Sequence, residues 1–511
     1  MPENLASFKV FAQGGLNTSR DVLSQGEVAP GSAIALINYE PAVTGGYRKI
    51  NGFSNDYGTV TGTGNVLGVA VADGINDGIL AARKPSSGTN YLHYWNNSTS
   101  AWVAVSSAGS PTMTGVSKVR FSKFNFGTPK VVLTDGINPA ATYDGSTYTQ
   151  ITHSDAPTDP KFSAIFQNHL FLAGDPAHPT KLFFSAPLAE TDFAASNGAG
   201  VINVGFPIVA IRSFRDELFI FGSTNIKKLS GTALANFVLQ TVTDDLGCLA
   251  TDSVIEIGGD LLFLSQDGLR PVSGTDKIGD VNLETVSKNI QSIFTDIVFD
   301  IDLDTLNAVT IKQKTQFRYF FGAADSQGII GGFRETPNGL RFEYSQMLGI
   351  SATAAASGYI GQNEFVIHGD STGKVYRQEQ GNSFAGTNIF SIFQTPYYYF
   401  QDPEQRKIIY NVATYLRSEG DNEIVMSAVY DYEDPDSLNP TNFTLSTEGA
   451  AAYYNEAAYN STAIFDGNPS PVQRTNISGS GRSVSFKYVT NDTNASHSIQ
   501  GLVVTFGVGD R

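Results

Sequence analysis

The sequence predicts an all-β protein in which a six- or seven-bladed β-propeller is followed by a C-terminal β-sandwich. Apolar stretches rich in β-branched and aromatic residues alternate with turn residues, and glycine accounts for 51 of the 511 residues. The recurrence of one hairpin pattern favours a propeller. The chain also exceeds the roughly 250–300 residues at which a single core stops growing. We therefore expect three parts: an N-terminal arm and first strand (1–60), the propeller (61–388) and the sandwich (389–511).

The N-terminal part contains a turn signal within residues 38–53, whose sequence is NYEPAVTGGYRKINGF. Gly45 and Gly46 permit the positive φ angles that tight turns need. Tyr47 and Arg48 follow directly. An ordinary turn at this position would close the first blade, with a late strand paired to an early one.

The propeller part contains seven segments that each read as an apolar strand, a turn rich in Gly, Asp, Asn or Pro, and a second strand. One apolar residue taken at the same place in each segment recurs about every 48 residues, close to the ~40–50 residues of a four-stranded blade. Radial stacking would cover faces that a lone blade leaves exposed. A series of unrelated β-sandwich domains is the alternative. The recurring residues are Ile79, Val131, Leu170, Leu218, Leu261, Phe317 and Phe365.

One helix is expected within the propeller part, in the segment VNLETVSKNIQSIF (281–294). Its apolar residues recur at helical spacing, and Asn282 can cap its N-terminus. We expect this helix to pack against the edge of a blade. The apolar residues are Leu283, Val286, Ile290, Ile293 and Phe294.

From about Ile389 the pattern changes to longer alternating strands. Apolar and polar side chains alternate in 424–430 and in 484–488, as they do in half-buried antiparallel strands. Residues 434–480 are rich in Asn, Ser and Gly, and we expect them to form long loops. The last 120 or so residues are therefore interpreted as a separate β-sandwich.

Charge and cysteine content limit the possible functions. The chain has 33 Lys and Arg against 49 Asp and Glu, a formal net charge of −16, which argues against wrapping a nucleic acid because phosphate neutralisation needs clustered cations. The charge permits DNA to pass through an acidic channel, where repulsion would prevent adhesion.

Cys248 is the only cysteine, so no internal disulfide is possible, and we expect it to be a small buried apolar residue. No secretory signal or membrane span is recognisable, so we expect synthesis in a reducing cytosol.

The sequence shows no catalytic, cofactor-binding or metal-binding motif, so we expect a protein that is not an enzyme and has no cofactor. His169 and His178 lie nine residues apart across a turn, which is not the spacing of typical zinc ligands. Asp300, Asp302 and Asp304 fall on one face of a possible strand, where they could hold Ca²⁺. They lack the glycine and glutamate of an EF-hand loop, so a solvated face is expected instead.

Several segments together resemble one known family. FAQGGLNTSRDVLSQGEVAPGSAIALINYEPAVTGGYRKINGF, from Phe11 to Phe53, is similar to the N-terminal segment of bacteriophage tail structural proteins. Similar phrases recur in SAPLAETDF, RDELFIFGSTNIKKLSG, DDLGCLATDSVIEIGGDLLFLSQDGL and the closing IQGLVVTFGVGDR. From about residue 7 to 511 the chain resembles the β-propeller nozzle, packaged-DNA-stabilisation or tail tubular proteins of short-tailed phages. That family is structural, so the resemblance carries over no catalytic residue.

The resemblance implies a component of the virion tail that is made in the cytoplasm of the host bacterium. Six copies would form a ring beneath the portal and adaptor proteins, retain packaged double-stranded DNA, and conduct it during ejection without sequence-specific binding. Distal tail proteins would dock on the other side. Within this hypothesis, Gly45, Gly46, Tyr47 and Arg48 form an arm that faces another subunit or the portal.

A glycan-binding or glycan-cleaving propeller is the second hypothesis, because aromatic blade surfaces can stack on sugar rings. Residues 265–268, SQDG, resemble the Asp-box turn of sialidases, but the segment lacks the Thr-Trp ending and has no second copy. A bacterial surface adhesin is a third possibility, which the missing secretory signal disfavours.

Overall fold

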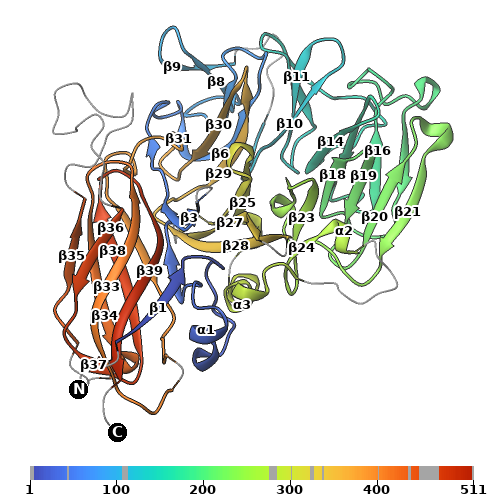
Figure 1. Ribbon diagram of the computed structural model, residues 1–511. Coiled ribbons are helices and arrows are strands. Elements are labelled where there is room, and N and C mark those ends of the chain that lie inside the picture. The colour runs from blue at the N-terminus through green and yellow to red at the C-terminus, as the bar shows by residue number, and fades with distance from the viewer. Residues whose placement is uncertain are drawn as a thin grey trace.

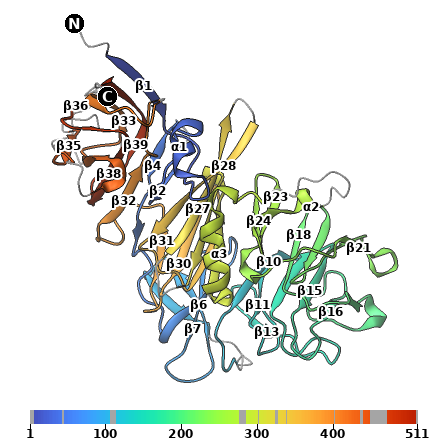
Figure 2. The same cartoon turned by 90° about the horizontal axis from the view of Figure 1, so that it is seen from below.

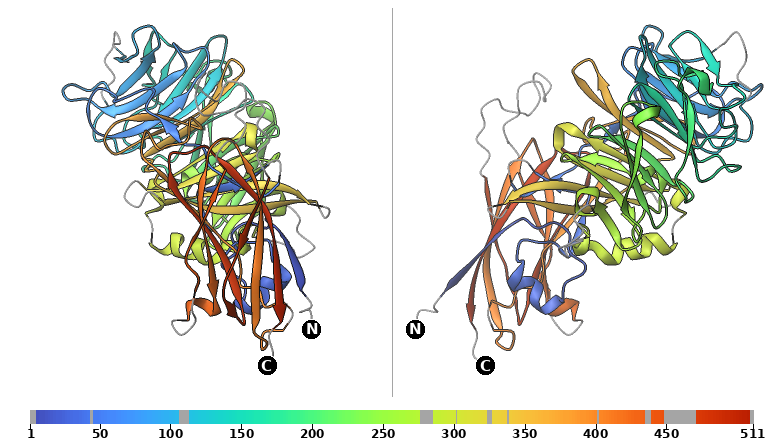
Figure 3. Two further views of the ribbon diagram at one scale, coloured as in Figure 1. Left: turned by 60° about the vertical axis from the view of Figure 1, so that its left-hand side comes forward. Right: turned by 90° about the vertical axis from the view of Figure 1, so that its right-hand side faces the viewer.

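Strands dominate the computed structural model and form a β-propeller and a β-sandwich that lie side by side (Figure 1). The predicted all-β class, with a propeller followed by a sandwich, is confirmed. Figure 3 shows that both chain termini lie at the end of the sandwich that points away from the propeller. The residues that the structure describes are 5–42, 45–105, 113–275, 285–300, 302–322, 327–336, 339–400, 402–434, 439–447 and 471–508.

Four consecutive four-stranded antiparallel sheets form the first part of the propeller. In each sheet the strands follow one another in chain order, so every connection is a local hairpin. Their strands are β6 (Thr63–Val71), β7 (Ile79–Lys84), β8 (Leu92–Asn96) and β9 (Ala101–Ala104); β10 (Arg120–Asn125), β11 (Pro129–Thr134), β12 (Ala141–Tyr143) and β13 (Tyr148–Gln150); β14 (Phe162–Phe166), β15 (His169–Ala173), β16 (Lys181–Phe184) and β17 (Gly200–Asn203); β18 (Ala210–Phe214), β19 (Glu217–Phe221), β20 (Ile226–Ser230) and β21 (Val238–Thr243).

Three further sheets complete the ring, so the described residues form six four-stranded blades and one three-stranded sheet. The last blade takes its outermost strand, β5, from the N-terminal segment. The strands are β22 (Ile255–Ile257), β23 (Asp260–Ser265) and β24 (Gly268–Pro271); β25 (Leu306–Ile311), β26 (Gln316–Phe321), β27 (Gln327–Thr336) and β28 (Gly339–Leu348); β29 (Ala354–Ile360), β30 (Asn363–Gly369), β31 (Val375–Gln378) and β5 (Phe53–Ser54).

The recurring apolar residues of the seven hairpin segments all lie in the second strand of a sheet. Ile79 is in β7, Leu218 is in β19 and Phe365 is in β30, and the other four occupy equivalent places. The second strand of a blade is covered on both faces by neighbouring blades, which explains why its residues are the most consistently apolar of the repeat.

The ring is closed by pairing an early strand with a late one. Phe53 lies opposite Gln378 and Ser54 opposite Arg377 in the β5–β31 ladder. The ring of Phe53 also stacks on Phe384, with 5.0 Å between ring centroids. The ladder joins residues that are more than 300 positions apart in the sequence.

The sandwich consists of two sheets that both include N-terminal strands. One sheet contains β1 (Ala6–Phe11), β3 (Tyr39–Pro41), β4 (Tyr47–Lys49), β33 (Lys407–Ser418), β36 (Val472–Asn476), β37 (Ser480–Gly481) and β39 (His497–Val508). The other contains β2 (Ala35–Ile37), β32 (Ile389–Gln394), β34 (Glu423–Tyr430), β35 (Phe443–Ser446) and β38 (Val484–Asp492).

The N-terminal residues therefore differ from the separate arm that we expected. The strand β1 pairs with β39 over six positions, and β4 extends the same sheet. Buried residues such as Tyr39 and Tyr47 belong to one core with the C-terminal strands. The partner strand β39 lies more than 400 residues away in the sequence, so no local sequence pattern predicts this pairing.

The propeller and the sandwich are joined by a continuous sheet. The strand β2 pairs in parallel with β28 of the propeller, at Ile37 and Gln346, and antiparallel with β32 of the sandwich. The result is a nine-stranded sheet that runs from one body into the other. A shared sheet makes this junction stiffer than a flexible linker would be.

The helices are short, and none in the described residues is both long and apolar enough to span a membrane. They are α1 (Val22–Val28), α2 (Val272–Thr275) and α3 (Gln291–Asp300). The predicted helix begins at Gln291, after a single turn at Lys288–Ile290, and Asn282 and Leu283 lie outside the described residues. Ile290 and Phe294 are buried, as expected for a helix packed on the sheets. Figure 2, which views the molecule from below, shows α1 beside the sandwich and α3 on the side of the propeller that faces the viewer.

Candidate functional site

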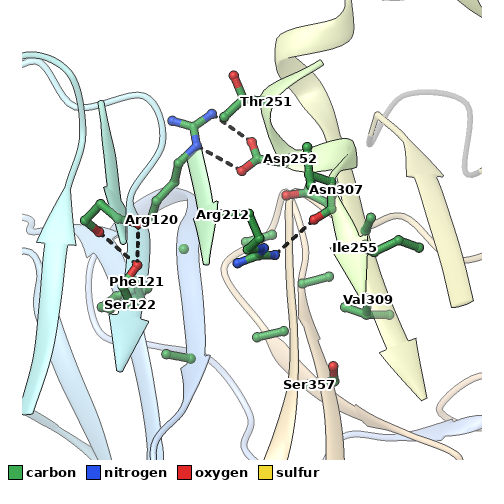
Figure 4. Close-up of a pocket in the computed structure, with 18 of the residues that line it drawn as sticks. Arg120, Phe121, Ser122, Arg212, Thr251, Asp252, Ile255, Asn307, Val309 and Ser357 are labelled. Atoms are coloured by element: carbon green, nitrogen blue, oxygen red, sulfur yellow. Dashed lines mark hydrogen bonds and ion pairs between the residues drawn. The ribbon is translucent and has the colours of Figure 1, made fainter. Parts of the chain in front are cut away.

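The inner strands of the propeller surround a central channel that contains a cavity of about 560 Å³ (Figure 4). Its walls are the first strands of the seven sheets, β6, β10, β14, β18, β22, β25 and β29. Many lining residues are small, so the few long side chains determine the chemistry of the channel. The charged lining residues are five basic and two acidic: Lys118, Arg120, Lys123, Arg212, Lys312, Asp252 and Glu256.

An ion-paired cluster around Asp252 crosses one part of the channel (Figure 4). Arg120 donates to both carboxylate oxygens of Asp252, at 2.9 and 2.7 Å, and Lys118 Nζ lies 2.7 Å from Oδ2. Burial alone would raise the pKa of Asp252, but the charges of Lys118 and Arg120 lower it to about 2. This carboxylate links the β10 side of the channel to the turn before β22, and it is a poor base because its lone pairs are already engaged.

Arg212, on β18, projects into the channel (Figure 4). Its Nη2 donates to the carbonyl oxygen of Val254 at 3.0 Å. In the part of the chain that the structure describes, no carboxylate forms an ion pair with this guanidinium. Burial lowers the pKa of Arg212, while the carboxylates Asp252 and Glu256 partly offset this effect from a distance.

Two lysines, Lys123 and Lys312, line the same cavity. Lys123 leans over β6 towards β29, where a methyl group built on Gly358 would lie 3.2 Å from its Nζ. Burial lowers the pKa of Lys123, Asp73 raises it, and the like charge of Lys312 lowers it further. Neither lysine forms a side-chain ion pair with any described residue. The carboxylate of Glu364 accepts from the backbone N–H of Lys312 at 2.7 Å, and Asp73 acts on Lys123 from a distance.

The described residues contain no group of three His, Cys, Asp or Glu side chains placed to hold a metal ion. His169 is buried and bonds through Nδ1 to the carbonyl oxygen of Ser185, at 2.6 Å. Asp302 accepts from the backbone N–H of Asp304, which itself pairs with a lysine. Cys248 is fully buried, as predicted, and burial raises the pKa of its thiol to about 11.

The four residues of the predicted interface arm lie in or beside β4. Tyr47 is fully buried, and its hydroxyl donates to the Gly31 carbonyl and accepts from the Gly15 N–H, both at 2.9 Å. Gly46 has a φ of +85°, and a Cβ there would lie 2.2 Å from the backbone oxygen of Ile499. Tyr47 and Gly46 are therefore packed against other parts of the same chain.

Arg48 and Gly45 occupy different surroundings. Arg48 donates to both carboxylate oxygens of Glu419, at 2.6 and 2.5 Å, so its charge is already used within the chain. Gly45 lies at the tip of the turn, and a Cβ added there would have no atom of the described residues within 4 Å. A contact between this turn and another subunit stays a prediction, and of the four residues only Gly45 is open to it.

Arg48 belongs to a buried charged network that we call the junction cluster, formed by Glu40, Arg48, Lys314, Arg318 and Glu379. Arg318 has a side-chain exposure of 0% and pairs with Glu379 and with Glu40, the latter at 3.6 Å. Lys314 also pairs with both carboxylates, at 2.7 and 2.5 Å. Burial raises the pKa of Glu379, but Arg318 and Lys314 outweigh that effect and hold it well below its ordinary value. Because β3 and β4 carry Glu40 and Arg48, the cluster fastens the sandwich to the last two blades.

A second unexpected feature is the orientation of α1. This helix buries Gln25 and Gly26, and it exposes Val22, Leu23 and Val28 to 50%, 56% and 67%. Gly26 is required because a Cβ would lie 2.1 Å from the Tyr397 carbonyl oxygen. The apolar side of the helix thus points outwards, opposite to the usual arrangement of a surface helix.

Further exposed apolar residues adjoin this helix. Phe11, 69% exposed, lies beside Gly31 just beyond the C-terminal end of α1. At the other end, Tyr432 is 44% exposed, and its pKa is raised by burial and by the nearby charge of Asp21. We call Phe11, Val22, Leu23, Val28 and Tyr432 the α1 face.

The geometry defines a β-propeller fused to a β-sandwich. No family model matches the chain, and no curated protein matches it. Solved structures with similar folds include the extracellular domain of a putative one-component system from B. thetaiotaomicron, with 11% identity and a TM-score of 0.39 over 70% of this chain and 43% of that chain. The chain thus matches less than half the length of that protein.

Two further similar structures have lower coverage of this chain. Hsv2 from Kluyveromyces lactis is 9% identical, with a TM-score of 0.32 over 56% of this chain and 98% of that chain. A chain of the mitotic checkpoint complex is 12% identical, with a TM-score of 0.36 over 66% of this chain and 96% of that chain. Similarity at this level concerns the fold alone.

Proposed function

We propose that the protein is a structural subunit of a bacteriophage tail, a nozzle-type protein whose copies form a ring that continues the portal channel. The ring would retain packaged double-stranded DNA and conduct it during ejection. Portal or adaptor proteins would lie on one side and distal tail proteins on the other. The resemblance of residues 7–511 to nozzle proteins supports this role. The observation that carries the assembly is the outward apolar side of α1.

Exposure of the apolar side chains of the α1 face to water is energetically unfavourable. Each of its residues exposes 44–69% of its surface, whereas a soluble helix normally turns such side chains inwards. Clustered exposed apolar residues mark surfaces that bind another protein. We propose that the occupant is a second copy of this chain.

A closed ring needs two different surfaces on each copy, because its contacts run head to tail. Leu234 and Val238, which we call the β21 surface, are 49% and 50% exposed on the outer part of the fourth blade. In Figure 1 this blade lies on the opposite side of the propeller from the sandwich and α1. Contact between the α1 face of one copy and the β21 surface of the next would propagate around a ring.

The stiff junction suits a subunit that bears load. The nine-stranded sheet and the junction cluster both connect the sandwich to the propeller. A hinge at this place would let the channel of an assembled ring deform. Buried ion pairs whose partners are all present hold a specific geometry even where they add little stability.

Electron microscopy of the purified protein tests the proposal. Top views with closed rotational symmetry and a central opening are the expected result, and six copies are the expected number. Isolated particles of single subunits at all concentrations, or open filaments, would overturn it. A monomer that bound host polysaccharide would favour the glycan hypothesis instead, which the burial of both tryptophans, Trp95 and Trp102, does not favour.

A further inference from the structure

The geometry of the channel points to a ligand. We propose that the propeller channel binds a small multivalent oxyanion of the phosphate class through the basic lining residues Arg212, Lys123 and Lys312. This site lies inside one subunit and does not depend on the proposed ring.

The size of the cavity is the first argument. Its volume of about 560 Å³ lies within the roughly 300–1,000 Å³ of pockets that hold small molecules. The inner strands contribute many small side chains, such as Ala70, Ser122 and Ala355, which leave space in the channel. A di- or triphosphate can enter such a channel, whereas the body of a DNA duplex cannot.

The charge of the lining is the second argument. The chain as a whole has 49 acidic and 33 basic residues, yet the channel has five basic and two acidic ones. Asp252 is neutralised by Lys118 and Arg120, so Glu256 is the only carboxylate left among the described lining residues against three further cations. A low-dielectric channel with this excess attracts anions from solution.

The missing counter-charges are the third argument. In the junction cluster, Arg48, Lys314 and Arg318 each pair with a carboxylate. In the channel, Lys123 and Lys312 have no ion pair with a described residue, and Arg212 has one hydrogen bond, to a neutral carbonyl. A guanidinium has five N–H donors, so Arg212 can offer the rest to a phosphate oxygen.

The titration of Lys123 agrees with this arrangement. The neighbouring charge of Lys312 contributes to lowering the pKa of Lys123, which means that the two ammonium groups repel each other. A bound oxyanion between them would remove this repulsion. Phosphate is a good partner because it accepts several charge-assisted hydrogen bonds at once.

Isothermal titration calorimetry with inorganic tripolyphosphate tests the proposal, with a nucleoside triphosphate in a second arm. The wild type should bind one ion per chain, and affinity should fall as NaCl is added. Arg212→Gln, or Lys123→Gln combined with Lys312→Gln, should weaken binding at least tenfold. Lys84→Gln is the matched control, because Lys84 is an exposed lysine at the end of β7, outside the channel, and it should bind like the wild type.

The two arms distinguish the sources of the phosphate. Binding of both probes would show a site that also admits a nucleoside, and binding of tripolyphosphate alone would show a site for the free ion. Absence of binding to the wild type, or equal binding by all variants, would overturn the proposal. Thermal unfolding gives a second readout: tripolyphosphate should raise the Tm of the wild type and leave that of the Lys123→Gln, Lys312→Gln variant unchanged.

Discussion

Arg318 shows how single residues hold the two bodies together. Its side chain is completely buried and pairs with Glu379 and Glu40 at the junction. Removing one member of a buried ion network leaves the opposite charge uncompensated. Glu379 belongs to the propeller and Glu40 to the sandwich. Removal of the Arg318 guanidinium should therefore weaken the junction between the two bodies.

We expect Arg318→Met to lower the free energy of unfolding by about 3–5 kcal/mol. Urea unfolding at neutral pH measures this value. The exposed Arg20→Gln is the matched control and should change stability by less than about 0.5 kcal/mol. Adding Glu379→Gln to Arg318→Met should restore part of the loss. Equal stability of Arg318→Met and the control would contradict the role of the junction cluster.

His497 should make stability depend on pH. It is fully buried between Tyr39, 2.8 Å from its Nε2, and Asn422, and burial together with Lys49 and Arg48 lowers its pKa to about 3. An unfolded histidine titrates near pH 6.5, so below that pH the unfolded chain binds a proton at His497 and the folded chain does not. The stabilising contribution is complete above pH 6.5 and is lost at about 1.4 kcal/mol per pH unit as the pH falls towards 3.

The matching experiment compares the wild type with His497→Gln at pH 7 and pH 5. Glutamine cannot titrate, so the variant should lose about 2 kcal/mol less than the wild type over this interval. His368, whose pKa burial also lowers to about 3, keeps its own contribution in both proteins. Identical pH dependence of the two proteins would show that the pKa of His497 is the same in the folded and the unfolded chain.

Residue-level features differ in how far sequence can predict them. The burial of Cys248 was predictable, because a lone cysteine without neighbouring histidines behaves as a small apolar residue. The junction cluster was not, because Glu40 and Arg318 are 278 positions apart and nothing in either local sequence indicates the other. The roles of Tyr47 and Arg48 within the chain were missed for the same reason.

At the scale of elements, the seven hairpins were predictable because both strands and their turn are contiguous in sequence. The ladder between β5 and β31 and the N-terminal strands of the sandwich were harder to foresee, since their partners come from the other end of the chain. We found no sequence pattern that predicts the helix α1. It has only seven residues, and its apolar side chains face outwards, so the usual inward periodicity is missing.

The α1 face yields a prediction about assembly. Leu23→Glu places a charge in the proposed contact, and Val238→Glu does the same on the β21 surface. Each should shift the protein from ring to monomer without unfolding it, because both residues are at least half exposed. Ile137→Glu, at a 45% exposed residue on neither surface, is the control and should still assemble. Analytical ultracentrifugation measures the outcome, and a Leu23→Glu variant that assembled like the wild type would rule out α1 as the contact.

At the scale of the whole molecule, propeller and sandwich should unfold together. They share a nine-stranded sheet and one core cluster that includes Tyr39 of the N-terminal strands and Phe317 of the propeller. Differential scanning calorimetry of the monomeric Leu23→Glu variant should therefore show one endotherm whose calorimetric and van't Hoff enthalpies agree. Two resolved endotherms would mean that the junction does not couple the bodies.

The overall architecture could be predicted from pattern alone, but the relation between the bodies could not. Periodic hairpins and alternating C-terminal strands indicated a propeller followed by a sandwich. The boundary at residue 60 followed sequence order, whereas the fold interleaves the first 50 residues with the last 120. Long-range strand pairing is decided by which edges remain open after the local hairpins have formed, and a single sequence does not reveal it.

Mass photometry of the wild-type protein would decide whether copies of this chain assemble into a closed ring. For a chain of 54.7 kDa we expect one discrete species at six times that mass, stable on dilution. A single species of 54.7 kDa at every concentration, or a ladder of masses without an end point, would contradict it.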